Sequence, residues 1–434
     1  MKLKIHFLVF SFFLLFQMLL WGKFCYCQEV VNYGGYLVIK EGAYLVIGGN
    51  YFNKNDGISD GKIYLDGNIL LNRNWVNYSN SKVLEMVGNG PVGNVIMNGT
   101  TQQAITGYHP SIFENLVLEN SKKVLNVNDC EVNDTMVLDA VLVLNSNKIK
   151  LLNSQPAAIK YKSNYILSET SSTDGLGEVE WHIGQEIDTY EVPFGSGIDT
   201  TTDLTVTLTT KSMGYPSEGS ISFATYPTGC QNFPLPTGVE ELDRDYEYIA
   251  DRYWLIDAQY EEKPGVSIIM EYRMDDLNTL CNGGLKESEM KAIRYNLTDD
   301  TWSDMDPTGY SDPSLKRFYI NDVSPENFYA PWCLVDDYQG WELFFPNAFT
   351  PNGDGVNDFF SPVGINLEDF EIRMYIYDRW GGLIYEMEDI DHPWDGHYGT
   401  TGAKCPQGIY TWIMFLKDRV GKEYDYTGIV ALIK

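Results

Sequence analysis

Short apolar runs separated by polar residues dominate the first third of the chain. The run Tyr36-Leu37-Val38-Ile39 recurs eight residues later as Tyr44-Leu45-Val46-Ile47, and similar runs continue to Leu152. No stretch shows the 3.6-residue apolar period of an amphipathic helix. The pattern predicts many short β-strands and no long helix in this part of the chain.

Asparagine often follows these runs, as at Asn120, Asn128, Asn145 and Asn153. An Asn side chain can bond neighbouring backbone groups at a turn, and identical Asn side chains can stack in ladders. Stacked coils with such corners would bury one continuous apolar core. We therefore predict a β-solenoid over residues 28–164, with an irregular antiparallel β region as the alternative.

A second region, residues 175–335, shows clearer alternation of apolar and polar positions. Leu204-Thr205-Val206-Thr207-Leu208 is one example, and further short runs are separated by turn residues. Alternation with period two indicates strands that have one buried and one exposed face. This region is predicted to be an antiparallel β-sandwich.

The last segment, residues 343–434, combines turn chemistry with short strands. Thr350-Pro351-Asn352-Gly353-Asp354-Gly355 holds residues that favour turns, and alternation follows from Ile372 to Tyr377. About seven short strands in about ninety residues fit a small immunoglobulin-like β-sandwich. The whole chain is accordingly predicted to be all-β.

The N-terminus has the pattern of a secretory signal peptide. Lys2 and Lys4 precede an apolar run from Ile5 to Trp21, and the small residues Cys25 and Cys27 stand before Gln28. We predict a signal peptide over residues 1–27 with cleavage between Cys27 and Gln28.

The charge of the chain limits the classes of partner. The net charge is −29, and removal of residues 1–27 takes away three Lys and no acid, which lowers it to −32. Nucleic acid is excluded as a partner because phosphate binding needs clustered basic residues. An acidic, solvated extracellular protein fits this composition.

Five cysteines remain after residue 27, an odd number with no CxxC spacing, so a zinc site is not expected. Cys230 and Cys281 are candidates for a disulfide bridge because both lie in loops of one predicted region.

The C-terminal segment contains an ordered series of uncommon motifs. LFFPNAFTPNGDGVNDFF begins at Leu343, DRWGG at Asp378, WDG at Trp394 and PQGIYTW at Pro406, before the closing run GIVALIK. This series resembles the gliding-motility-associated C-terminal domain, the type B sorting domain of the bacterial type IX secretion system. The resemblance implies secretion to the cell surface by the type IX translocon, with a PorP/SprF-like outer-membrane protein as partner. The residues that match the sorting motif are Pro346, Asn347, Phe349, Pro351, Asn352, Gly353, Asp354, Gly355, Asn357, Asp358, Asp378, Arg379, Trp380, Gly381, Trp394, Asp395, Gly396, Gly408 and Tyr410.

Two further sites are suggested by short motifs. Asn352, Asp354 and Asp358 could supply oxygen ligands to calcium, although the positions that normally hold the first and twelfth ligands of a calcium loop are Thr350 and Ser361. The alternative is a hydrogen-bonded turn that supports a strand. Asp134-Thr135-Met136 resembles an acceptor for bacterial O-glycosylation at Thr135.

No catalytic constellation is visible. The chain has no HExxH and no GxSxG motif, and any pair among its 60 acidic residues is uninformative. Aromatic residues make up 14% of the chain, so a surface glycan is a candidate ligand, with Trp75 and Tyr78 as candidates for exposed rings unless they lie in the core. We predict a surface structural or adhesive protein without enzymatic activity. A carbohydrate-binding module is the alternative, followed by a polysaccharide-degrading enzyme.

Overall fold

The computed structural model divides the chain into two compact units, the first ending at Asp336 and the second including Asp337–Lys434. The structure describes residues 24–79, 83–85, 92–168, 176–197, 202–229, 235–236, 238–239, 249–277, 285–303, 309–336, 343–364, 367, 370–399, 401–417 and 423–434.

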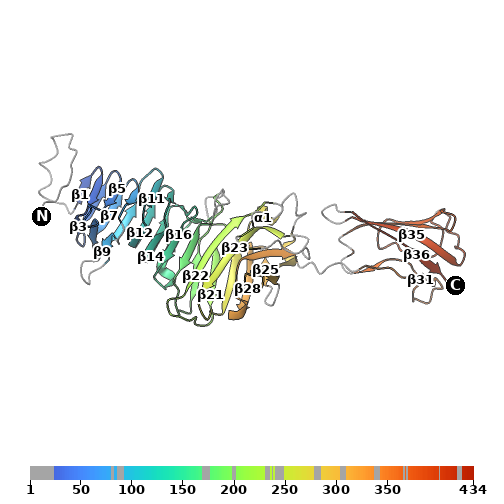
Figure 1. Ribbon diagram of the computed structural model, residues 1–434. Helices are drawn as coiled ribbons and strands as arrows, with labels where there is room; N and C mark the ends of the chain where they lie inside the picture. Colours follow the sequence, from blue (N-terminus) through green and yellow to red (C-terminus); the bar gives the residue numbers. More distant parts are fainter. Residues whose placement is uncertain are drawn as a thin grey trace. The chain divides into compact units, whose positions relative to one another are not determined.

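The N-terminal part of the first unit is a stack of short parallel strands (Figure 1). One sheet, called here the long sheet, contains β1 (Phe24–Cys27), β4 (Tyr44–Ile47), β7 (Asn68–Leu71), β10 (Asn94–Met97), β12 (Ser111–Glu119), β14 (Cys130–Asp139) and β16 (Lys148–Leu151), with β17 (Ile159–Tyr161) beside β14. A second sheet contains β2 (Val30–Tyr33), β5 (Tyr51–Lys54), β8 (Trp75–Asn77), β11 (Gln103–Gly107), β13 (Lys123–Leu125), β15 (Leu142–Val143) and β18 (Ile166–Leu167). A third sheet contains β3 (Tyr36–Ile39), β6 (Lys62–Leu65) and β9 (Leu84–Glu85).

These sheets confirm the predicted β-solenoid and exclude the irregular antiparallel alternative. One coil advances the register by 24 residues where Tyr44 pairs with Asn68, and by 19 where Cys130 pairs with Ile149. The eight-residue spacing in the sequence is therefore not the coil period. It separates β3 from β4, which are consecutive strands in different sheets.

Identical positions of successive coils form columns in the interior. Ile47, Leu71, Met97, Leu118 and Leu138 are neighbours in the register of the long sheet, and all five are fully buried. Each such side chain contributes roughly 1.5–3 kcal/mol relative to an exposed position. The column explains why every second residue of these short runs is apolar.

Asparagines at the corners bond to the coil before them, as the sequence predicts. The Nδ2 atoms of Asn120, Asn128 and Asn145 donate to the backbone oxygens of Asn98, Gly107 and Leu125 at 2.7–2.8 Å. Asn120 and Asn145 also have positive φ values of 66° and 52°. Asn tolerates this backbone conformation better than most residues, so one residue type both turns the chain and links two coils.

The second part of the first unit consists of two antiparallel sheets. The long sheet continues through β19 (Glu178–Trp181), β22 (Ser220–Pro227), β23 (Ile249–Gln259), β29 (Trp332–Asp336), β25 (Met290–Asn296) and β26 (Thr301–Ser303). The other sheet contains β20 (Thr189–Val192), β21 (Val206–Thr210), β24 (Val266–Glu271), β28 (Arg317–Val323) and β27 (Tyr310–Asp312). The described helices are short: α1 (Met274–Leu277), η1 (Pro156–Ala158), η2 (Glu287–Glu289) and η3 (Pro325–Asn327).

The solenoid and the antiparallel sheets share the long sheet. β19 pairs in parallel with β16 on one side and antiparallel with β22 on the other. Trp181 of β19 and Tyr190 of β20 are both fully buried, with ring centroids 5.1 Å apart, so they pack the two antiparallel sheets together. Strand pairing thus continues across the boundary predicted between residues 164 and 175.

The second unit is a small β structure. A five-stranded sheet has the order β31 (Ala348–Phe349), β36 (Glu423–Leu432), β35 (Gly408–Lys417), β33 (Glu371–Tyr377) and β34 (Leu383–Met387), and β30 (Leu343–Phe344) pairs with β32 (Val363–Gly364). One face of the five-stranded sheet covers an apolar core that includes Trp394, Trp412 and Met414. The predicted all-β class is therefore confirmed for this unit as for the first.

One prediction needs correction, and others concern residues outside the described part of the chain. Trp75 is not exposed: it is fully buried, with its ring 4.4 Å from that of Tyr51, because it starts β8 with its side chain inward. Most of the predicted signal peptide, residues 1–23, lies outside the described residues, as do Cys230 and Cys281. Within the described part of the chain, no helix is both long and apolar enough to cross a membrane.

Candidate functional site

The first part of the sorting motif forms a closed loop in the second unit. The carboxylate of Asp358 accepts hydrogen bonds from the backbone N–H groups of Asn352, Gly353 and Gly355, at 3.0, 2.6 and 2.7 Å. Both glycines have positive φ, which their lack of a Cβ permits at no steric cost. The Asp358 carboxylate therefore holds three backbone N–H groups of this turn in place.

These contacts also lower the pKa of Asp358. The N–H groups of Gly353 and Gly355 hold the pKa of Asp358 below its ordinary value, since they stabilise the charged form. A depressed carboxyl pKa contributes stability that is present above the unfolded-state pKa and is lost as the pH falls through the folded-state pKa. Protonation of Asp358 under acid conditions should therefore weaken these hydrogen bonds.

The three candidate calcium ligands lie in this loop and already contact one another. Asn352 donates through Nδ2 to Asp354 at 2.9 Å, and the Asp354 N–H donates to the Asn352 side chain at 2.9 Å. Calcium would therefore compete with hydrogen bonds at Asp354 and Asp358. Calcium binding stays a prediction, which a calorimetric titration of the full chain against an Asp358→Asn control would check.

The second part of the motif is the hairpin turn between β33 and β34. The Asp378 carboxylate accepts from the N–H groups of Trp380 and Gly382, both at 2.8 Å, and Gly381 has a φ of 82°. Trp380 between them is 88% exposed. The sequence thus fixes the backbone of this turn while it leaves a large aromatic ring in solvent.

The remaining motifs build the core beneath the first loop. Trp394 is fully buried, its ring centroid lies 5.0 Å from those of Phe349 and Tyr410, and its Nε1 donates to the backbone oxygen of His397 at 2.9 Å. Backbone hydrogen bonds between Trp394 and Phe360 tie the end of the first loop to the same place. The structure therefore brings the PNAFTPNGDG, WDG and GIY motifs together around one aromatic cluster.

Other members of the predicted motif serve the backbone. Asn347 accepts through its backbone oxygen from the N–H of Ala431, which attaches β31 to β36. A Cβ on Gly408 would lie 3.6 Å from the Arg379 guanidinium, so that side chain reaches the first residue of β35. The Asp378 turn and the start of β35 are therefore neighbours.

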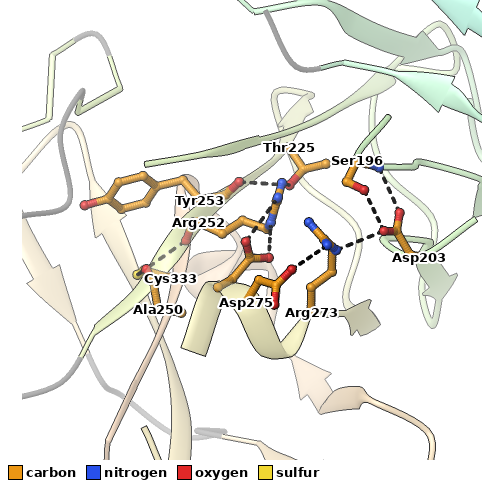
Figure 2. Close-up of polar contacts among 10 residues, drawn as sticks. Ser196, Asp203, Thr225, Ala250, Arg252, Tyr253, Arg273, Asp275 and Cys333 are labelled. Atoms are coloured by element: carbon orange, nitrogen blue, oxygen red, sulfur yellow. Dashed lines mark hydrogen bonds and ion pairs between the residues drawn. The ribbon is translucent and has the colours of Figure 1, made fainter. Parts of the chain in front are cut away.

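The first unit contains a polar cluster that the sequence did not reveal (Figure 2). Arg252 of β23 is almost fully buried, and its guanidinium donates to Asp276 of α1 at 2.6 and 3.4 Å and to the Thr225 hydroxyl at 3.1 Å. Nearby, Arg273 contacts Asp203 at 3.0 Å and Asp275 at 2.8 Å. The sequence offers no way to single out these Asp residues, because the chain contains 60 acidic residues.

A pocket of about 430 Å³ lies beside this cluster, and its lining includes Asp203, Glu271, Arg273 and Lys316. The charged groups of its wall already pair with protein partners: Glu271 with Arg317, and Lys316 with Glu287, both at 2.8 Å. We therefore interpret the cluster as a set of structural hydrogen bonds and ion pairs that link neighbouring elements. Among the described residues, no group of three or more His, Cys, Asp and Glu could hold a metal ion.

Thr135, the predicted glycosylation residue, lies on β14 in the solenoid. Its side chain is half-buried, while Asp134 before it is exposed and accepts a hydrogen bond from Asn153 at 2.9 Å. The position is therefore on the outer side of the long sheet. Its modification stays a prediction.

The C-terminal unit is the part of the chain that a comparison with known families identifies. Residues 343–432 match the CHU_C Type IX secretion signal domain. This match confirms the resemblance noted in the sequence and implies export through the type IX secretion system to the cell surface. A search of curated proteins found no match to the chain.

Proposed function

We propose that this chain is a structural or adhesive protein of the bacterial cell surface, in which the second unit directs export and the first unit presents a rigid β surface. The observation that carries this proposal is the combination of a type IX secretion signal domain with a solenoid. The secretion signal domain places the protein at the cell surface, and the first unit is the part displayed there.

The construction of the first unit supports a passive structural role. The long sheet runs from the first coil of the solenoid into the antiparallel region without a break in strand pairing (Figure 1). Corner asparagines and buried columns link each coil to the next. A solenoid stabilised by neighbour-to-neighbour contacts offers a long, ordered surface, which suits attachment better than it suits a catalytic cleft.

We propose that the first unit has no hydrolytic or lyase activity. The charged residues around its described pocket form ion pairs with protein partners, as Arg273 does with Asp203 and Asp275. A catalytic acid or base would instead need an environment that shifts its pKa toward the working pH.

Carbohydrate binding is the second candidate, favoured by an outward aromatic row on the second solenoid sheet. The Tyr78 ring lies 6.5 Å from Phe52 and 4.8 Å from Tyr108, and the Lys54 ammonium lies over Phe52 and Tyr78. Tyr108 is well exposed. Phe52 and Tyr78 are stacked and Tyr108 is tilted against Tyr78, so a sugar would meet ring edges and the outermost ring rather than a series of open faces.

Deletion of residues 343–434 tests the export step. We expect the truncated chain to accumulate in the periplasm, while a reporter with a signal peptide and this segment reaches the cell surface. Normal surface display of the truncated chain would contradict the assignment. A PorP/SprF-like partner should co-purify with the full chain and not with the truncated one.

A glycan-binding and hydrolysis screen on the full secreted chain separates the roles proposed for the first unit. Saturable binding without turnover, lost in Tyr108→Ala, would move the assignment to a carbohydrate-binding module. Turnover abolished by one carboxylate substitution would overturn the non-catalytic proposal.

A further inference from the structure

In the C-terminal unit, one face of the five-stranded sheet covers the core. The opposite face also carries apolar side chains. β35 alternates fully or largely buried residues such as Trp412 and Met414 with outward residues, and the outward set includes Ile409, Ile413 and Phe415. A strand that is apolar on both faces is typical of a sheet covered on both sides. Among the described residues of this unit, the buried core cluster lies on one side of the sheet.

Neighbouring strands extend this apolar surface across the sheet. In one row, Leu383 pairs with Tyr377, Tyr377 with Thr411, and Thr411 with Ile429. In the next row, Tyr375 pairs with Ile413. We call Tyr375, Tyr377, Leu383, Ile409, Ile413, Phe415 and Ile429 the outer apolar face.

The side chains of this face reach solvent. Ile409 and Ile429 are each 60% exposed, Leu383 is 53% exposed and Phe415 is 48% exposed. Charged residues lie at the margin, where Arg373 and Asp425 flank Phe415 and Glu386 pairs with Tyr375 in the register. An apolar centre with a charged rim is the arrangement found in protein interfaces.

We propose that the outer apolar face is the surface by which a protein of the type IX export machinery holds the domain. This inference rests on the proposed export function and adds the contact surface. A membrane is the weaker occupant because residues 343–434 contain 14 acidic and 7 basic residues, and this excess of negative charge is repelled by anionic lipid. The partner surface should be apolar at its centre and basic toward its edge.

A triple variant of the full chain, Ile409→Thr, Phe415→Thr and Ile429→Thr, tests the proposal. Threonine favours strands, so the sheet should form while the apolar centre is lost. The matched control is Phe344→Thr, Val356→Thr and Val363→Thr, which changes similarly exposed residues of the same unit outside this face. We expect surface export of the first variant to fall about tenfold or more and that of the control to stay near wild type, because central apolar residues dominate interface energies.

A second measurement covers the case in which the triple variant fails to fold. A photo-crosslinking amino acid placed singly at Ile409 or Phe415 in exporting cells should capture an envelope protein, and one at Val356 should not. Export of a folded triple variant at the wild-type level, or equal crosslinking from all three positions, would overturn the inference. If deletion of residues 343–434 still blocks export in that case, the export function stands and only the surface is wrong. A dimer of the wild-type chain that the triple variant converts to a monomer, without loss of export, would identify a second copy as the occupant and also overturn it.

Discussion

Lys123 shows how a single residue of the solenoid is held in an unfavourable charge state. Its side chain is buried at a corner, where Nζ donates to the backbone oxygens of Glu119 at 2.6 Å and Ser121 at 2.5 Å. Burial lowers the pKa of Lys123 to about 8. Its register neighbour one coil earlier is Gln103, which is also buried and binds the backbone oxygens of Leu71 and Arg73.

Replacement of Lys123 by Gln should stabilise the protein at neutral pH. The folded-state pKa lies below the ordinary value of 10.5, so the penalty for burying the ammonium is complete below pH 8 and is relieved as the pH rises toward 10.5. We expect the variant to gain on the order of 1 kcal/mol at pH 7 and less at pH 10. Thermal unfolding of both proteins at the two pH values checks this, and a gain that does not shrink with pH would contradict the assignment.

Two tryptophans of the sorting motif should behave in opposite ways. Trp394→Ala removes a fully buried ring and should cost about 3–5 kcal/mol, whereas Trp380→Ala removes an exposed ring and should change stability by less than about 0.5 kcal/mol. Thermal unfolding of the full chain measures both. Equal losses would show that Trp380 supports the fold.

The buried position of Trp75 is also explained at the residue scale. Its Gly- and Asn-rich surroundings resemble a surface turn, but all three residues of β8 are buried. Trp75 pairs with Tyr51 in the coil before it and with Ile105 in the coil after it, and all three side chains point inward. A strand of three residues is too short to reveal its inward face from the sequence alone.

At the scale of the element, the solenoid corner combines a hydrogen bond with an unusual backbone conformation. Asn145→Ala would lose the bond to Leu125 and leave alanine at a φ of 52°, whereas Asn128→Ala would lose only the comparable bond to Gly107. We expect the Asn145 variant to be less stable than the Asn128 variant by about 1 kcal/mol. Chemical denaturation compares the two.

Asn145→Gly supplies the control for this comparison. Glycine tolerates positive φ, so this variant should lose the hydrogen bond without the steric cost and fall close to Asn128→Ala. If Asn145→Gly were as unstable as Asn145→Ala, the φ argument would be wrong.

Strand identity could be predicted at this scale, but strand partners could not. The runs Tyr36–Ile39 and Tyr44–Ile47 coincide with β3 and β4 because apolar content and flanking turns are local signals. The pairing of Lys148 with Glu178 joins residues 30 positions apart, and the bond between Arg252 and Asp276 joins residues 24 apart. Such contacts depend on how the sheet closes, which no local pattern encodes.

The sequence also held a signal for the outer apolar face. The run Ile409-Tyr410-Thr411-Trp412-Ile413-Met414-Phe415-Leu416 is almost continuously apolar, where a strand with one solvent face should alternate. The family motifs instead include the turns at Asp354 and Asp378. The structure shows that the turn residues shape the backbone, whereas the residues of the outer apolar face are exposed on the strands.

At the scale of the whole molecule, export and processing leave a signature in the mass of the protein. The predicted cleavage after Cys27 would remove β1, which pairs with β4 at the first coil, so the secreted chain should begin at Gln28 and its long sheet at β4. The predicted glycan on Thr135 would add to that mass. Intact-mass analysis of protein recovered from the cell surface therefore detects both signal-peptide cleavage and glycosylation.

We expect a chain that begins at Gln28 and carries a sugar increment, and Thr135→Val should remove the increment alone. Thr135 is half-buried on the outer side of β14, so valine should fit the strand without disturbing the buried Met136 beside it. Thr101→Val is the matched control, since Thr101 is exposed but follows another threonine rather than an aspartate. An unmodified wild-type protein, or an increment that survives in Thr135→Val, would rule out the site, and a mass that includes Phe24–Cys27 would place β1 in the mature solenoid.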